Sequence, residues 1–167
     1  PRERPVVRDE SFVHRVPVSE LTRRLKDPDS GVRYWSVMAL QARLENPAAV
    51  EKALISLLQD PSPSVQIIAA ETLCLMDVTV KEVYQALENN LDTPDRPWVV
   101  LQAARAAASI GEKAKALVPQ IKTIYPRYQG SVWNRYKSWS YPMFIGFALD
   151  QTLINCGKLS HEDLTNN

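Results

Sequence analysis

Few residues of this sequence have the type and spacing that catalysis needs. Its two histidines, His14 and His161, lie near opposite ends of the chain, and neither is embedded in an apolar helical pattern. A Ser/His/Asp or Cys/His arrangement requires a histidine within hydrogen-bond reach of the nucleophile. One end of the chain would therefore have to fold across the rest of the molecule. We expect a non-catalytic chain, and we expect no cofactor.

Two pairs of carboxylates are the next candidates for chemistry. Asp27 and Asp29 form one pair, and Asp92 and Asp95 form the other. Each pair stands beside a proline at the entry of an expected helix, where aspartate ordinarily forms a turn or caps the helix. We therefore assign these residues to turns and not to general acid–base catalysis.

The two cysteines do not indicate a metal site or a disulfide. Cys74 falls at the end of an expected buried helix, where a cysteine usually acts as a small apolar residue. Cys156 and His161 alone provide too few ligands for a metal ion. We expect two free thiols and no metal site.

Aromatic and basic side chains gather in residues 125–141. The stretch from Lys113 to Leu149 contains basic residues and no acidic ones, although the whole chain has a net charge of only +1. Aromatic rings stack on sugars or contact protein surfaces, and arginine and lysine attract sulfate or carboxylate groups. The candidate binding residues of this segment are Arg127, Trp133, Arg135, Tyr136, Lys137, Trp139 and Tyr141.

Three interpretations of this segment remain open. It covers the last helix as a structural cap, docks on a preceding domain, or contacts a ligand. Basic residues interleaved with aromatic ones also suit single-stranded nucleic acid. Helical-repeat proteins that read nucleic acid usually carry a broader basic face, however, and a net charge of +1 creates no general attraction for it. We therefore do not expect nucleic acid as the partner.

A repeated pattern of helices must position these residues. Its central copy begins with Asp60 and Pro61, which fix a turn, and continues into a helix for which Ser64 is the predicted N-cap. The apolar positions of that helix share one face at helical spacing. These positions are Val65, Ile68, Ala69, Thr72 and Leu73.

The same pattern occurs once before and once after this copy. Val32 lies 33 residues before Val65, and Val99 lies 34 residues after it. Ala103 is the counterpart of Ala69, and both should face a neighbouring helix closely. A shorter amphipathic stretch precedes each copy, so one period consists of an outer helix, a turn and an inner helix.

The predicted fold is all-α: an α-solenoid, or α–α superhelix, of about four helix pairs. We expect outer helices over residues 19–26, 47–59 and 80–91, and a fourth over 114–125 that bends or restarts at Pro119. Gly111 should end the third inner helix, and Pro142 should open the last one.

The domain boundaries follow from this pattern. Residues 18–157 should form the repeat domain, with the aromatic and basic insertion at 125–141. Residues 1–17 read as a linker from a preceding domain, and residues 158–167 read as a polar tail. Because the sequence begins with Pro1 and not with methionine, we expect it to be a piece of a longer chain.

The repeat also aligns side chains on neighbouring inner helices. The second and sixth positions after each repeat valine should form an inner-helix ridge made of Tyr34, Met38, Ile67, Glu71, Leu101 and Arg105. Glu71 and Arg105 are then neighbours of opposite charge. We predict an ion pair of about 0–1 kcal/mol between them if they are exposed, unless both side chains simply point into solvent.

The Asp-Pro-x-x-x-Val turn followed by an alanine-rich helix resembles HEAT repeats of the PBS-lyase-like kind, over residues 18 to about 125. Many such repeats carry an arginine directly after the valine, which pairs with a turn aspartate of a neighbouring repeat. Only Arg33 fits this pattern, because Gln66 and Val100 occupy the equivalent places. The resemblance therefore implies an incomplete ladder of Asp/Arg pairs.

Segments 29–35, 62–73 and 98–104 are also similar to the helical region appended C-terminally to many secreted bacterial sulfatases. This resemblance implies a periplasmic or secreted accessory domain for interaction or scaffolding. Its partner would be the preceding catalytic domain of the same chain, another protein, or a sulfated glycan. The alternative is a free-standing HEAT-like protein that binds nucleic acid or acts like a glycosylase. We expect no membrane partner, because no apolar run approaches the roughly 20 residues of a spanning helix.

Overall fold

The computed structural model describes residues 16–43, 47–78, 80–128, 140–160 and 163. Regular structure within these ranges is helical throughout, with no strand. The α-helices are α2 (Val18–Arg24), α3 (Ser30–Arg43), α4 (Pro47–Leu57), α5 (Pro63–Leu75), α6 (Lys81–Leu91), α7 (Pro97–Ser109), α8 (Val118–Ile124) and α9 (Tyr141–Asn155). Two 3-10 helices, η1 (Gly111–Leu117) and η2 (Tyr125–Arg127), flank α8.

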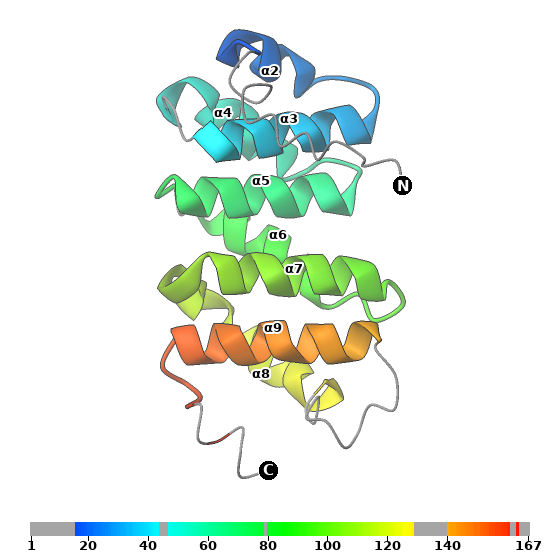
Figure 1. The fold of residues 1–167 in the computed structure, drawn as a ribbon, viewed down its shortest axis with the longest axis vertical. Coiled ribbons are helices and arrows are strands. Elements are labelled where there is room, and N and C mark those ends of the chain that lie inside the picture. Colours follow the sequence, from blue (N-terminus) through cyan, green and yellow to red (C-terminus); the bar gives the residue numbers. More distant parts are fainter. Residues whose placement is uncertain (1–15, 44–46, 79, 129–139, 161–162, 164–167) are drawn as a thin grey trace, which may run out of the picture.

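The helices form a stack of pairs. The inner helices α3, α5, α7 and α9 lie one below another with nearly parallel axes, and α4, α6 and α8 lie behind them (Figure 1). Each inner helix packs on the next one in the stack. The pairs are α2 with α3, α4 with α5, α6 with α7, and the segment η1–α8 with α9. The predicted all-α solenoid of four helix pairs is confirmed.

The core lies between the two layers of helices. Outer helices contribute large side chains to it, of which Leu54, Leu87 and Ile121 are completely buried. Inner helices contribute large side chains as well, together with small ones where they meet each other, and the predicted contact positions Ala69 and Ala103 have no exposed surface. Because alanine occupies little space, adjacent inner helices approach each other closely.

The close contact at Ala69 leads to a prediction about stability. A leucine there has no free volume to occupy, and overpacking a core typically costs about 1–3 kcal/mol. We therefore expect Ala69→Leu to lower the midpoint of thermal unfolding, which circular dichroism measures. Ala116→Leu is the matched control because Ala116 is exposed. Equal midpoints for the two variants would contradict the packing described for α5.

The turn before α5 differs from the prediction at Ser64. The helix begins at Pro63 with Ser62 at the N-cap position, and proline is well suited to this first position because its missing N–H is not needed there. The Oδ1 of Asp60 fixes the turn by accepting a hydrogen bond from the Ser62 N–H at 2.8 Å. The hydroxyl of Ser64 instead donates to Oε1 of Gln102 at 2.7 Å, which joins α5 to α7.

The end of α7 and the fourth outer helix largely follow the prediction. Gly111 follows the end of α7 with a φ of 61°, a conformation that favours glycine. The fourth outer segment starts earlier than expected, as the 3-10 helix η1, and α8 restarts at Val118 with Pro119 as its second residue. The predicted restart at Pro119 is therefore confirmed.

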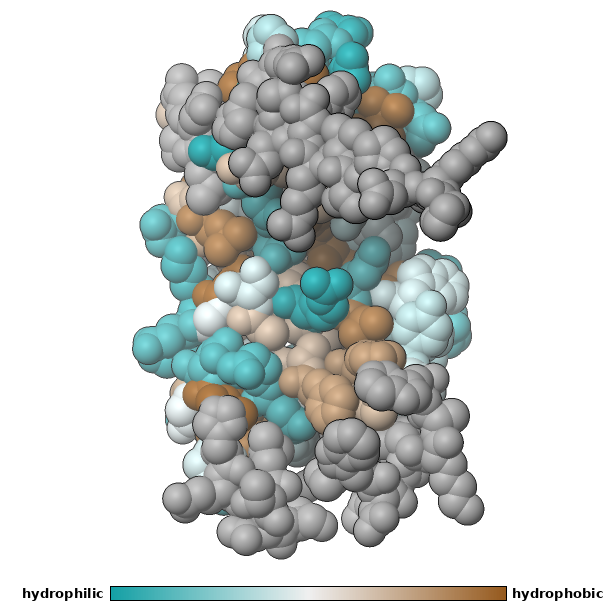
Figure 2. Space-filling view, in the orientation of Figure 1, coloured by the Kyte–Doolittle hydropathy of each residue, from teal (hydrophilic) through white to brown (hydrophobic). Residues whose placement is uncertain are grey.

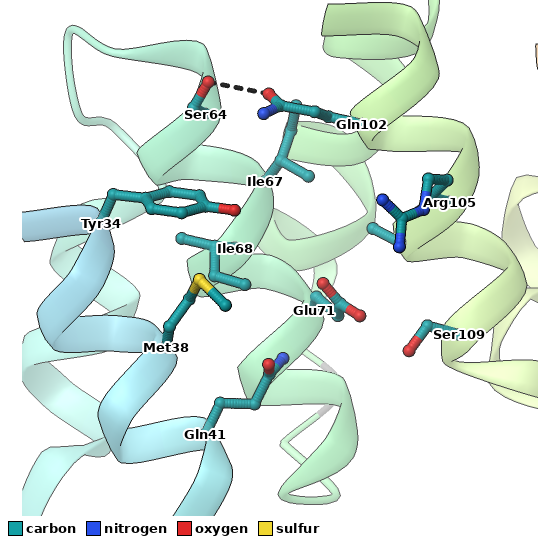
Figure 3. Close-up of a pocket in the computed structure, with 11 residues that line it drawn as sticks. Tyr34, Met38, Gln41, Ser64, Ile67, Ile68, Glu71, Gln102, Arg105 and Ser109 are labelled. Atoms are coloured by element: carbon teal, nitrogen blue, oxygen red, sulfur yellow. Dashed lines mark hydrogen bonds between the residues drawn. The ribbon is translucent and has the colours of Figure 1, made fainter. Parts of the chain in front are cut away.

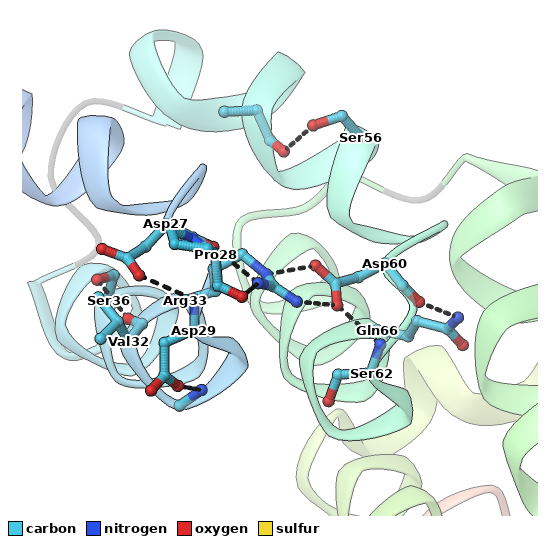
Figure 4. A network of polar contacts seen from close by, with 12 residues as sticks. Asp27, Pro28, Asp29, Val32, Arg33, Ser36, Ser56, Asp60, Ser62 and Gln66 are labelled. Carbon is cyan, nitrogen blue, oxygen red and sulfur yellow. Dashed lines mark hydrogen bonds and ion pairs between the residues drawn. The ribbon is translucent and has the colours of Figure 1, made fainter.

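A buried ion pair joins the first two repeats (Figure 4). Nε and Nη2 of Arg33 donate to the two carboxylate oxygens of Asp60, each at 2.7 Å. Nη1 donates to the carbonyls of Asp27 at 2.7 Å and Pro28 at 3.0 Å. The arginine therefore clamps the turn of its own repeat to the turn of the next one. These charge-assisted bonds raise the pKa of Arg33 above its ordinary value.

Amide side chains replace the ion pair further along the stack. Nε2 of Gln66 donates to the backbone carbonyl of Asp60 at 2.6 Å, and Nδ2 of Asn90 donates to Oε1 of Gln66 at 2.9 Å. Gln66 stands where an arginine would continue an Asp/Arg ladder. The predicted interruption of that ladder is confirmed at this position.

Both cysteines are buried free thiols, as predicted. Burial raises the pKa of the Cys74 thiol from 9.0 to about 11, which lowers its thiolate fraction near pH 8 by about a hundredfold. We therefore expect Cys74 in a Cys156→Ala variant to resist Ellman's reagent at pH 8 until denaturant is added. Rapid reaction of the folded variant would contradict the burial of Cys74.

Candidate functional site

The exposed large hydrophobic side chains of the described ranges all belong to inner helices. They are Trp35 on α3 (66% exposed), Trp98 on α7 (51%), and Tyr141 (48%), Phe144 (38%) and Phe147 (45%) on α9. The described parts of the outer helices expose no comparable side chain. Contiguous exposed apolar surface commonly marks a site of interaction. Figure 2 shows such surface at the level of α7 and α9, next to hydrophilic surface.

A groove of about 730 Å³ runs between α7 and α9, and we call it the α7–α9 groove. Residues three, four or seven apart share one face of a helix, and this spacing places one row of side chains from each helix along the groove. The lining residues are Leu101, Arg105, Ala108, Ser109, Phe144, Phe147, Ala148 and Gln151. The opposite face of α9 carries Ile145 and Leu149, which are completely buried in the core. The sequence of α9 is therefore apolar on two faces, only one of which packs inside the molecule.

A smaller pocket of about 290 Å³ lies beside this groove, between α3, α5 and α7, and we call it the polar pocket. Five of the six predicted ridge residues line it: Tyr34, Met38, Ile67, Glu71 and Arg105. The sixth, Leu101, lines the α7–α9 groove. The structure therefore brings the predicted ridge together on one face, and Figure 3 shows side chains from three inner helices meeting there.

Arg105 belongs to both hollows. It is exposed, and it lines the polar pocket on one side of α7 and the α7–α9 groove on the other. Among the groove's lining residues it is the one that carries a charge. The two hollows thus form a single surface, apolar toward α9 and polar toward α3.

The predicted ion pair between Glu71 and Arg105 is wrong. The two side chains project into the polar pocket from α5 and α7 (Figure 3), but no salt bridge joins these two described residues. The repeat spacing places their backbones side by side, whereas the long side chains of half-buried Glu71 and exposed Arg105 can adopt rotamers that keep the charges apart. A double-mutant cycle of Glu71→Gln and Arg105→Gln, followed by urea unfolding, should show no measurable coupling. A clear coupling free energy would show that the two charges do interact.

Gln41 adds a polar group at the edge of the polar pocket. Its Nε2 is buried and finds no acceptor among the described protein atoms. A buried donor without an acceptor typically costs about 1–3 kcal/mol.

The predicted aromatic and basic segment lies mostly outside the described residues. Trp133, Arg135, Tyr136, Lys137 and Trp139 all fall in the range 129–139 and stay predictions. Of the described members, Arg127 is exposed and its Nη1 donates to Oδ1 of Asp92 at 3.1 Å. Tyr141 is the first residue of α9 and is 48% exposed. These two residues do not line either hollow of the inner-helix face.

One contact ties the described start of this segment to the last inner helix. The hydroxyl of Tyr125 in η2 donates to the carboxylate of Asp150 on α9. Burial, together with this bond, raises the pKa of the Tyr125 phenol well above its ordinary value. This side of the fourth helix pair is therefore fixed by a hydrogen bond as well as by apolar packing.

The described residues show neither a metal site nor a membrane-spanning helix. In the ranges given above, no three His, Cys, Asp or Glu side chains are grouped so that they could hold a metal ion. None of the helices in these ranges has both the length and the apolar character to cross a membrane. His14 and His161 lie outside the described residues.

Comparison with known proteins finds a family match for the central helix pairs. Residues 51–123 match the model of a family described as HEAT repeats. The match begins within α4 and ends within α8. No curated relative matches the sequence. The match and the stacked helix pairs agree with the resemblance found in the sequence: residues 51–123 are similar to HEAT repeats, and the described helices fold as an α-solenoid.

Proposed function

We propose that this chain is a non-catalytic interaction or scaffold domain that binds another protein through its inner-helix face. By this face we mean the α7–α9 groove together with the polar pocket. The observation that carries the proposal is the exposure of Phe144 and Phe147 along the α7–α9 groove, while the described parts of the outer helices expose no large hydrophobic side chain. The outer helices are amphipathic in the ordinary way and bury their apolar sides in the core.

The composition of this face supports a protein partner. Protein interfaces are enriched in aromatic residues, methionine and arginine, and their centres are poor in charge. The face provides these residue types on α3, α7 and α9, as Tyr34, Met38, Arg105, Phe144 and Phe147. Solenoids built from stacked repeats commonly use one extended face for binding.

A comparison of two variants tests this proposal. Phe147→Asp places a charge in the α7–α9 groove, whereas Gln85→Asp places the same charge on exposed surface of the outer helix α6. We expect the first variant to weaken binding to the parent protein's remaining polypeptide, supplied separately, by about tenfold or more in calorimetry. The second should bind as the unchanged chain does. Equal affinities for the two variants, or no binding by the unchanged chain, would contradict the proposal.

We further propose that the parent protein is an exported bacterial sulfatase and that this chain is its C-terminal accessory domain. The support is the similarity of segments 29–35, 62–73 and 98–104 to the corresponding region of such enzymes. In this arrangement the chain docks on the catalytic domain or contacts its sulfated glycan, and it acts in the periplasm or outside the cell. The excess of basic residues between Lys113 and Leu149 suits an acidic surface.

The gene upstream of Pro1 tests this identification directly. A reading frame that encodes a Cys/Ser-x-Pro-x-Arg signature ahead of Pro1 would support it. A start codon immediately before Pro1 would exclude it and would favour a free-standing HEAT-like protein.

A further inference from the structure

We infer that the inner-helix face recognises a protein segment that carries a large apolar side chain, then a carboxylate, then a basic side chain. The apolar side chain occupies the α7–α9 groove, the carboxylate binds Arg105, and the basic side chain binds Glu71. This inference rests on the proposed function, because it names the chemistry of the partner that the same face binds.

The α7–α9 groove selects the apolar side chain. Phe147 is 45% exposed at its edge, and Leu101 on α7 lines the opposite side. The groove has a volume of about 730 Å³, which accommodates a large aliphatic or aromatic group. Burial of such a group yields roughly 25 cal/mol per Å² of apolar surface removed from water. The groove is therefore the anchoring part of the face.

Arg105 selects the carboxylate. Its side chain forms no salt bridge with the described residues, and it stands at the border between the apolar groove and the polar pocket. Arginine presents a planar group of donors that binds a carboxylate through two parallel hydrogen bonds. When an apolar side chain of the partner occupies the groove, the residues next to it in the partner's sequence lie close to the Arg105 guanidinium.

Glu71 selects the basic side chain. It lines the polar pocket from α5, one helix further along the stack than Arg105, and it too forms no salt bridge with the described residues. A partner that carried two carboxylates in a row would meet repulsion here, whereas a basic side chain meets an unused acceptor.

The geometry of the stack sets the spacing of these three groups. Packed helices lie about 8–10 Å apart, and an extended chain advances about 3.3 Å per residue. A segment that crosses the inner helices at a right angle therefore passes from Arg105 to Glu71 in about three residues. The groove lies between α7 and α9, about half that distance from Arg105. The apolar anchor should thus precede or follow the carboxylate by one or two residues, with the basic residue on the far side.

A random peptide library displayed on phage, selected against the whole chain, tests this pattern. We expect the enriched peptides to share an apolar residue, a carboxylate and a basic residue in this order or its reverse. A synthetic peptide of the enriched sequence should lose about tenfold in affinity with Arg105→Glu, measured by fluorescence anisotropy. Replacing the peptide carboxylate with lysine should restore binding to Arg105→Glu and weaken binding to the unchanged chain.

Arg96→Glu is the matched control for this charge reversal. Arg96 precedes α7, is exposed, and pairs with Asp95 at 3.7 Å outside both hollows. The Arg96→Glu variant should bind the peptide with unchanged affinity. An equal loss with Arg96→Glu would show a general effect of charge and would overturn the inference.

The outcomes separate this inference from the proposed function. If Phe147→Asp weakens docking of the parent polypeptide while Arg105→Glu and the swapped peptide have no effect, the proposed function stands and the inference is overturned. If neither Phe147→Asp nor Arg105→Glu alters docking, both fail. Binding of a sulfated oligosaccharide that is lost with Arg105→Glu, without enrichment of the peptide pattern, would also overturn the inference.

Discussion

Replacement of Asp60 by alanine should lower the free energy of unfolding by about 3 kcal/mol. The carboxylate holds Nε and Nη2 of Arg33 at 2.7 Å, and the side chains of the pair are only 4% and 10% exposed. Removal of Asp60 leaves a buried guanidinium without its counter-ion. The cost arises mainly from this uncompensated charge and is larger than the net benefit of the intact pair.

A surface pair in the next turn provides the control. Asp92 binds Arg127 at 3.1 Å, but their side chains are 51% and 49% exposed. Water and salt screen such a pair, so Asp92→Ala should change stability by no more than about 1 kcal/mol. Urea unfolding of both variants, followed by circular dichroism, measures the difference. If Asp60→Ala is no more destabilising than Asp92→Ala, the ion pair does not hold the first two repeats together.

The second large effect concerns α9, where truncation of Leu149 should affect stability and truncation of Phe147 should affect binding. Leu149 has no exposed surface, and its truncation to alanine should cost about 3 kcal/mol, within the range usual for buried leucine. Phe147 lies two residues away and is 45% exposed. Its truncation to alanine should leave the unfolding free energy nearly unchanged and should weaken partner binding instead.

Denaturant unfolding and calorimetric binding of both α9 variants check this separation. The m-value of Leu149→Ala should stay that of the unchanged chain, because the unfolded surface is the same. A loss of stability in Phe147→Ala as large as in Leu149→Ala would mean that this side of α9 is part of the core. The proposed binding face would then lose its anchor.

The repeat architecture could be predicted because each level of the sequence indicates the same structure. The spacing of Val32, Val65 and Val99 fixes the period, and proline-containing turns mark where the first three inner helices begin. The small side chains at Ala69 and Ala103 indicate close helix contacts, and both residues are completely buried. A fold can be predicted from its sequence when the turns, the periodicity and the residue sizes all indicate the same structure.

The binding face was only half predicted, because sequence periodicity locates backbones and does not orient side chains. The ridge positions of Glu71 and Arg105 lie together as predicted, but no ion pair forms between them. Ser64 was expected to cap α5, yet its hydroxyl bonds to Gln102 because the helix already begins at Pro63. The first difference depends on side-chain conformation, and the second depends on the exact residue at which the helix begins.

The α7–α9 groove was not predicted, although one signal for it exists in the sequence. Around α9, apolar residues occupy more than one face, since Phe144 and Phe147 do not share the face of Ile145 and Leu149. A helix that is apolar all round is either buried on every side or covered by a partner. The sequence does not say which, because that depends on whether another helix packs on the second face.

The hydrogen bonds that join successive repeats differ from one junction to the next, so the order of the repeats matters. Arg33 requires the carboxylate of Asp60 in the following turn, whereas Gln66 requires only a carbonyl and the amide of Asn90. A deletion of the second period would therefore put Arg33 in place of Gln66 at the junction with α6, where Asn90 now donates to the glutamine side chain. The junctions of this array differ in chemistry, so its repeats are not interchangeable as those of a uniform solenoid are.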